Sequence, residues 1–98
     1  MLTHYRRRRD EPRGDEYDAW GGSDWYFEID EDSYAVRQIE VYEAGRTLRY
    51  GLEHDEDEYG SLTFSPFEAD EWEPFLISAK DFEQAWLAAA NPPKPTAG

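Results

Sequence analysis

Three consecutive segments between residues 24 and 53 alternate apolar and polar residues, and this pattern constrains the fold more than any other feature of the chain. A period of two residues is typical of β-strands that bury one face. The segments cover residues 24–30, 34–43 and 46–53, and their apolar series are Trp25, Phe27 and Ile29; Ala35, Ile39 and Val41; and Leu48, Tyr50 and Leu52. The connections between the segments are short, so we expect an antiparallel meander.

The turn between the second and third segments predicts their register. If Ala44-Gly45 form a two-residue hairpin loop, with the glycine supplying the positive φ of such turns, Val41 lies opposite Leu48 and Ile39 lies opposite Tyr50. Apolar pairs then share one face, and a slip of one residue would separate them.

The first turn is constrained by the same argument. The Trp25 series shares the face of Ile39 only if the connection has an odd number of residues. We therefore expect a three-residue loop, Glu31-Asp32-Ser33, with Asp30 opposite Tyr34.

A helix is predicted near the C-terminus. Ser78 followed by Asp81 resembles a capping box, and Asn91-Pro92-Pro93 would end the helix. Between them, apolar residues recur at helical spacing and are expected to pack on the sheet: Phe82, Ala85, Trp86 and Ala89.

These elements predict an α+β fold: a three- to four-stranded antiparallel β-meander with one C-terminal α-helix packed on one face. Residues 62–64 would supply the fourth strand. We expect residues 1–23 to be a flexible basic-to-acidic arm, residues 24–90 to be a single domain, and residues 91–98 to be a Pro-rich disordered tail.

The charge of the chain is unevenly distributed. Five arginines and two acidic residues lie in residues 1–14, whereas the rest of the chain holds five basic and 21 acidic residues, within a net charge of -13. Arg6–Arg9 resemble a nucleic-acid patch, but the acidic body would repel nucleic acid and compete for the arginines. We expect no direct nucleic-acid binding and an arm that folds back on the body.

Several classes of protein are not expected. The chain has no cysteine, which excludes disulfides and thiolate chemistry, and no apolar run long enough for a signal peptide or a membrane span. We expect a cytoplasmic monomer without a cofactor.

The segment HDEDEYG, residues 54–60, raises the question of a metal site or catalysis. A calcium loop that began at Asp55 would have Gly60 at its sixth position but Pro66 in place of the closing glutamate. Only two histidines are present, and no nucleophile or phosphate-binding motif is found. We expect no metal site and no enzyme activity, and keep a carboxylate-dependent hydrolase or a divalent-metal-binding protein as the alternative.

The acidic loops have two further interpretations. They could serve only to keep an aromatic-rich protein soluble. They could also form a recognition surface for a basic protein, such as a toxin or nuclease, with exposed Tyr26, Tyr42 or Tyr59 as anchors. The partner-binding residues are then predicted to be Asp30, Glu31, Asp32, Asp55, Glu56, Asp57, Glu58 and Tyr59.

Residues 24–88 also resemble a known family. The segments are WYFEIDEDSYAVRQIEVYEAGR, EYGSL and EWEPFLISAKDFEQAW, with the motifs Arg37-Gln38-x-Glu40-x-Tyr42 and Trp72-Glu73-Pro74-Phe75. They resemble short, acidic, uncharacterised bacterial domains similar to the immunity proteins of polymorphic toxin systems. The resemblance implies an inhibitor rather than an enzyme, and it brings no catalytic residues.

Overall fold

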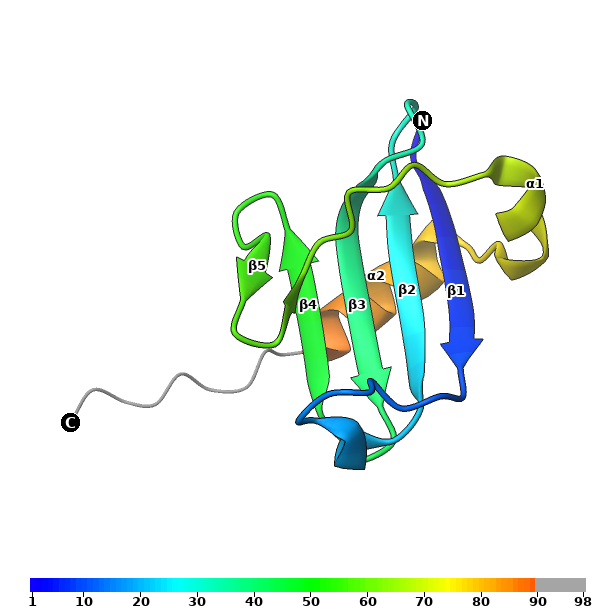
Figure 1. The fold of residues 1–98 in the computed structure, drawn as a ribbon. Coiled ribbons are helices and arrows are strands. Elements are labelled where there is room, and N and C mark those ends of the chain that lie inside the picture. Colours follow the sequence, from blue (N-terminus) through cyan, green and yellow to red (C-terminus); the bar gives the residue numbers. More distant parts are fainter. Residues whose placement is uncertain (90–98) are drawn as a thin grey trace.

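The computed structural model describes residues 1–89 and shows a four-stranded antiparallel sheet in the order β1-β2-β3-β4. Every strand therefore pairs with its neighbour in the sequence, and helix α2 lies across one face of the sheet (Figure 1). The predicted α+β meander with one packed helix is confirmed. The main strands are β1 (Thr3–Arg9), β2 (Ser23–Ile29), β3 (Ala35–Tyr42) and β4 (Thr47–Gly51).

Shorter elements complete the described part of the chain. A 3-10 turn, η1 (Asp18–Trp20), precedes β2, and a small hairpin of β5 (Glu56–Asp57) and β6 (Gly60–Ser61) follows β4. A helical turn, α1 (Ala69–Trp72), and a second 3-10 turn, η2 (Glu73–Phe75), lead to α2 (Ala79–Ala88). No helix in residues 1–89 is long and apolar enough to cross a membrane.

The prediction of a flexible arm over residues 1–23 is wrong, because Thr3–Arg9 form β1 and pair with β2 along their whole length. His4 and Tyr5 are buried, and the guanidinium of Arg6 lies 5.3 Å from the ring of Tyr26. The sequence pattern concealed this strand because the aliphatic part of an arginine can cover apolar surface although the residue is charged.

The fourth strand is thus β1 and not residues 62–64, which form no strand. Trp20 also packs against the core, so the compact unit begins before residue 24. The predicted tail, residues 91–98, lies outside the described residues.

The expected arm does turn its arginines back on the acidic body. Arg8 forms ion pairs with Asp24 and Glu43, and Arg7 with Glu71. That part of the prediction is confirmed.

The predicted first turn is also confirmed. The backbone N–H of Asp30 donates to the carbonyl of Tyr34 at 2.9 Å, so these two residues face each other across a three-residue loop. The carboxylate of Asp30 accepts the N–H groups of Asp32 and Tyr34, while Ser33 has a φ of 71°. An aspartate that caps the backbone in this way is a common cause of turns.

The predicted β3–β4 register is wrong by one residue. Tyr42 N–H donates to the carbonyl of Arg46, which makes a three-residue loop with Gly45 in the left-handed region at φ 92°. Ile39 consequently lies opposite Arg49 and not Tyr50. A three-residue loop with glycine in this conformation is a favoured alternative to the two-residue turn.

The β2–β3 register contains an irregularity between Glu28 and Ile29, and Tyr26 rather than Trp25 lies opposite Ile39. The Trp25 series therefore does not share the face of Ile39, contrary to the prediction. Both faces of the sheet are covered, which explains why apolar residues are divided between them.

We call the face of the sheet that α2 covers the helix face, and the opposite face the loop face. On the helix face, Ile39 and Phe82 are fully buried, and Trp86 packs beside them. The loop face is covered by the connecting segments that pass in front of the sheet in Figure 1. Its buried cluster comprises Tyr5, Phe27, Ile29, Ala35, Tyr42, Leu48, Tyr50 and Leu62.

Helix α2 begins where the sequence predicted. Ser78 accepts the N–H of Asp81 at 3.0 Å as the N-cap, and Phe82 and Ala89 face the sheet as expected. The capping bond satisfies one of the free N–H groups of the first turn.

Candidate functional site

The acidic hairpin, which we define as residues 52–61, holds five of the eight predicted partner-binding residues. It lies beside β4, whereas the turn that contains the other three lies at the end of the sheet near the N-terminus (Figure 1). The structure does not bring the two groups into one acidic array.

Asp57 turns inward and braces the hairpin. Its carboxylate accepts the hydroxyl of Tyr50 at 2.9 Å and the backbone N–H groups of Tyr59 and Gly60 at 2.8 and 3.2 Å. Burial opposes ionisation of this group, but these hydrogen bonds hold the pKa of Asp57 below its ordinary value. Asp57 is therefore a structural residue and not part of a free acidic surface.

Tyr59 is not a free anchor either. Its ring lies half-buried, with its centroid 5.3 Å from that of Tyr17 and 5.6 Å from that of Trp20. Its carbonyl accepts a hydrogen bond from Arg13. Tyr26 is half-buried and Tyr42 is buried, so none of the three expected aromatic anchors is exposed.

Of the four acids of the hairpin that were predicted to bind a partner, three remain exposed. Within the described residues, the side chains of Asp55, Glu56 and Glu58 have neither an ion pair nor a hydrogen bond. Leu52 lies at the start of the same segment with 77% of its surface exposed. The hairpin thus presents acidic groups and one apolar side chain together.

In the other predicted group, two of the three acids have local partners. Asp30 caps its turn, and Glu31 pairs with the N-terminal amino group at 2.7 Å. Asp32 is exposed. This group stabilises its own turn and is the weaker candidate for recognition.

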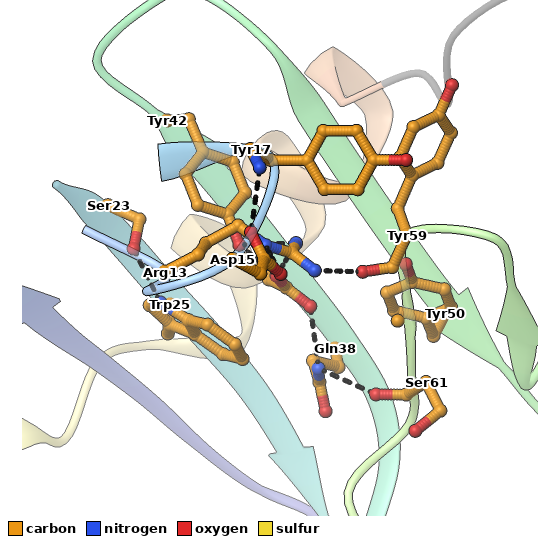
Figure 2. A network of polar contacts seen from close by, with 12 residues as sticks. Arg13, Asp15, Tyr17, Ser23, Trp25, Gln38, Tyr42, Tyr50, Tyr59 and Ser61 are labelled. Carbon is orange, nitrogen blue, oxygen red and sulfur yellow. Dashed lines mark hydrogen bonds and ion pairs between the residues drawn. The ribbon is translucent and has the colours of Figure 1, made fainter. Parts of the chain in front are cut away.

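A polar network on the loop face holds the hairpin to the sheet (Figure 2). The amide of Gln38 donates to the carbonyl of Ser61 at 3.2 Å and accepts the N–H of Thr63 at 2.9 Å. Arg13 donates to Tyr59 from the other side and forms an ion pair with Asp15 at 3.0 Å. These contacts hold the C-terminal part of the hairpin to the sheet.

Glu40 lies at the centre of this network and is only 3% exposed. Its carboxylate accepts hydrogen bonds from Tyr42 and from Gln38, whereas the nearest guanidinium nitrogen, on Arg13, is 3.9 Å away. Burial raises the pKa of Glu40, and the hydrogen bonds only partly offset this.

The helix face holds a second polar cluster. Arg37 binds Glu28 through two nitrogens, each at 2.7 Å, and His4 lies 2.9 Å from the same carboxylate. Arg37 also pairs with Glu83 of α2. The two-fold contact with Arg37 holds the pKa of Glu28 below its ordinary value although the group is buried.

Two hollows open beside these clusters. One, of about 510 Å³, lies next to the acidic hairpin and is lined in part by Val36, Leu52, His54 and Trp86. The other, of about 480 Å³, lies beside β1 and is lined in part by Arg7, Arg9, Trp25 and Trp72. Both have the volume of ordinary ligand or side-chain pockets.

Sequence reasoning missed Arg13, Gln38 and Glu40. The two residues of β3 alternate with apolar neighbours, so the pattern assigned them to a solvent-facing surface. The signal that could have revealed them was Tyr42, two positions further on the same face, which can bond a carboxylate.

The described residues contain no group of three or more His, Asp or Glu side chains that could hold a metal ion. No family model, curated protein or solved structure matches this chain.

Proposed function

We propose that this chain is a non-enzymatic binding domain of the inhibitor or immunity type, which recognises a basic protein through its acidic hairpin. The observation that carries the proposal is the combination of Asp55, Glu56 and Glu58, exposed and unpaired within residues 1–89, on a hairpin that the network of Asp57 and Gln38 holds rigid. Pre-positioned charges lose little conformational freedom when a partner binds.

The hollow beside the hairpin supports the same proposal. Charged rims accelerate and orient association, whereas a buried apolar anchor supplies most of the affinity. Leu52 and Trp86 offer apolar surface in this hollow, and Glu53, an exposed acid of the same hairpin, also lines it. The proposed partner therefore combines a basic surface with an apolar side chain that enters this hollow.

The ion pairs of two arginines also favour an acidic binding surface at the hairpin. Arg8 and Arg37 have their guanidinium groups in ion pairs with this chain's own carboxylates. They are consequently occupied by other carboxylates of this chain and do not pair with the acids of the hairpin.

The alternative of a carboxylate-dependent hydrolase would rely on Glu40, whose pKa is raised. The cavity beside it measures about 180 Å³, below the usual range of about 300–1,000 Å³ for ligand pockets. The binding proposal is therefore the better supported of the two.

The test compares two triply neutralised variants that change the net charge equally. One carries Asp55→Asn, Glu56→Gln and Glu58→Gln. The matched control carries Glu68→Gln, Asp70→Asn and Glu73→Gln, all exposed positions at or next to α1. Immobilised wild-type protein and the control should retain the same basic protein from a bacterial lysate, and the hairpin variant should lose it.

Kinetics of the retained partner make the test specific. Neutralising the hairpin should slow association at low salt and have little effect at high salt, because exposed charges are screened beyond about 8 Å at physiological ionic strength. Leu52→Ser should instead accelerate dissociation at every salt concentration. If both triple variants lost binding equally, net charge alone would explain it and the proposal would be rejected.

A further inference from the structure

We propose that the outer edge of β1 at Arg6–Arg9 is a second docking site, which binds an extended segment of a partner protein as an added strand of the sheet. The segment carries one carboxylate and, two positions away, one bulky apolar residue. This surface is separate from the acidic hairpin, and the inference goes beyond the proposed function.

The outer edge of β1 is only partly covered. The carbonyl of His4 accepts the N–H of Ile77 at 3.0 Å on the outer side of β1, next to a bridge between Tyr5 and Leu76. Backbone groups of alternate residues in an antiparallel strand point to the same side, so those of Arg8 also point outward. Within residues 1–89 no segment pairs with this edge beyond Tyr5.

Such an edge offers free N–H and C=O groups to an incoming strand. Figure 1 shows α1 next to the first part of β1, while the part near its C-terminal end has no neighbour on the outer side. Main-chain hydrogen bonds to an exposed edge are a common basis for the recognition of extended peptides.

The same edge carries an exposed positive charge at Arg9. Within the described residues, Arg9 is the only arginine whose side chain has no ion pair, hydrogen bond or ring contact. Arg9 is exposed, and it follows Arg7 on the same side of the strand. A cross-strand carboxylate opposite Arg9 would give this cation the partner that it lacks.

A hollow of about 480 Å³ lies beside the edge. Trp25 and Phe27 of β2 and Trp72 of α1 contribute its apolar surface. Its charged surface comes from three cations and two acids: Arg7, Arg8, Arg9, Asp10 and Glu11. The guanidinium of Arg7 lies 5.0 Å from the ring of Trp72, and this contact positions the Trp72 side of the hollow. Residues two apart on an added strand face the same side, so one can meet Arg9 while the other enters the hollow.

The remaining charges decide the kind of occupant. With a net charge of -13, the body repels a long polyanion such as nucleic acid, whereas a segment with a single carboxylate meets little repulsion. A second copy paired β1 to β1 would place arginines opposite arginines, which is destabilising. The occupant we infer is therefore a weakly anionic, extended peptide segment.

The test uses the peptide acetyl-TVETFVT-amide, in which Glu and Phe are two positions apart, and hydrogen exchange of the full chain followed by NMR. At about ten times its dissociation constant, the peptide should slow exchange of the outward-facing Arg8 amide about tenfold. Tryptophan emission should change in parallel because Trp25 and Trp72 line the hollow.

Matched variants separate the contributions. Arg9→Glu should weaken peptide binding at least about tenfold, the effect of losing roughly 1.4 kcal/mol, whereas Lys80→Glu, with the same charge change on α2, should leave it unchanged. Arg8→Pro should abolish binding, since it removes an outward N–H that no strand of the sheet uses. Arg8→Gln, which loses the same ion pairs but keeps the N–H, should bind.

Several results would overturn the proposal. One is the absence of binding at millimolar peptide with the wild-type chain folded. A second is binding that leaves the Arg8 amide unprotected, or that survives Arg8→Pro, since this would mean occupation of the hollow without strand addition. A third is a dimer that sedimentation detects in the wild-type chain and not in Arg9→Glu. This result would mean that the edge of β1 binds a second copy of the chain instead of a peptide segment.

Discussion

Glu28 and Glu40 are 5% and 3% exposed on neighbouring strands of one sheet, and yet their carboxyl groups behave in opposite ways. Glu28, on the helix face, has a lowered pKa, and Glu40, on the loop face, has a raised one. Arg37 contacts Glu28 directly at 2.7 Å. Arg13, by contrast, lies 3.9 Å from Glu40 and donates hydrogen bonds to Tyr42 and Tyr59.

The comparison shows that burial alone does not decide the charge of a carboxyl group. Glu40 lies deeper among protein atoms and loses more of its hydration, and only Glu28 gains a directly bonded cation that stabilises its ionised form. Glu40 receives hydrogen bonds from the neutral side chains of Tyr42 and Gln38, which stabilise the charge less. The helix face is thus held by an ion pair, and the loop face by a polar network.

The largest expected effect comes from removing the cation of the helix face. Arg37→Met should lower the free energy of unfolding by about 3 kcal/mol, at the low end for a broken buried pair because the Arg37 side chain is 24% exposed. Urea denaturation measures this loss. The double variant Glu28→Gln/Arg37→Met should recover part of it, and full additivity of the two single changes would contradict a direct pair.

A smaller loss is expected from the corresponding change on the loop face. Arg13→Met should cost about 1–2 kcal/mol, since it removes hydrogen bonds to Tyr59 and Tyr42 but leaves Glu40 with its closer partners. Amide exchange at Tyr59 and Gly60 should accelerate more than exchange in β2. An equal acceleration throughout the sheet would show that Arg13 does not act on the hairpin specifically.

The pH dependence should have opposite signs for the two glutamates. Stabilisation from Glu28, with its lowered pKa, is present above the unfolded-state value and disappears as pH falls through the folded value. Stabilisation from Glu40, with its raised pKa, is present at low pH and disappears as pH rises through the folded value.

Each pKa unit of difference between the folded and unfolded states corresponds to about 1.4 kcal/mol. Unfolding of wild type, Glu28→Gln and Glu40→Gln should be measured between about pH 3 and pH 8. The advantage of wild type over Glu28→Gln should grow with pH, and its stability relative to Glu40→Gln should decline. Parallel curves would refute the contrast.

Exposed carboxylates should show the smallest effect. Neutralising Asp55, Glu56 and Glu58 should change the free energy of unfolding by less than about 0.5 kcal/mol for each position. Thermal denaturation at low and high salt checks this. A large loss would mean that the hairpin acids stabilise the fold, and the recognition proposal would lose its main support.

The sequence predicted those features that depend on short-range chemistry. The three-residue turn at Ser33 was predicted correctly, although the shared face of Trp25 and Ile39 from which it was inferred does not exist. The start of α2 followed from Ser78 and Asp81. The β3–β4 register failed because apolar pairing predicts a register only if one face is buried. Here Gln38 and Glu40 are also buried, and Gln38 bonds Ser61 and Thr63, which the period of two cannot indicate.

The candidate site was predicted less well for a related reason. The acidic run was recognised, but composition does not reveal which of its members turns inward. Asp57 does so because Tyr59 and Gly60 present N–H groups to it in a tight turn, a pattern typical of aspartate before such a bend. The arginines of β1 were taken for a flexible arm because their contacts with aromatic rings depend on β2 and α1. The sequence alone does not show that these elements lie beside them.

The position of α2 in the sequence has a consequence for biosynthesis. Each strand pairs with the strand that precedes or follows it, so the sheet can assemble stepwise while the nascent chain emerges. The helix that covers Ile39 comes after all of the strands. During translation the helix face therefore passes through a stage in which it is formed but uncovered, and chaperones that bind apolar surface would meet the chain at that stage.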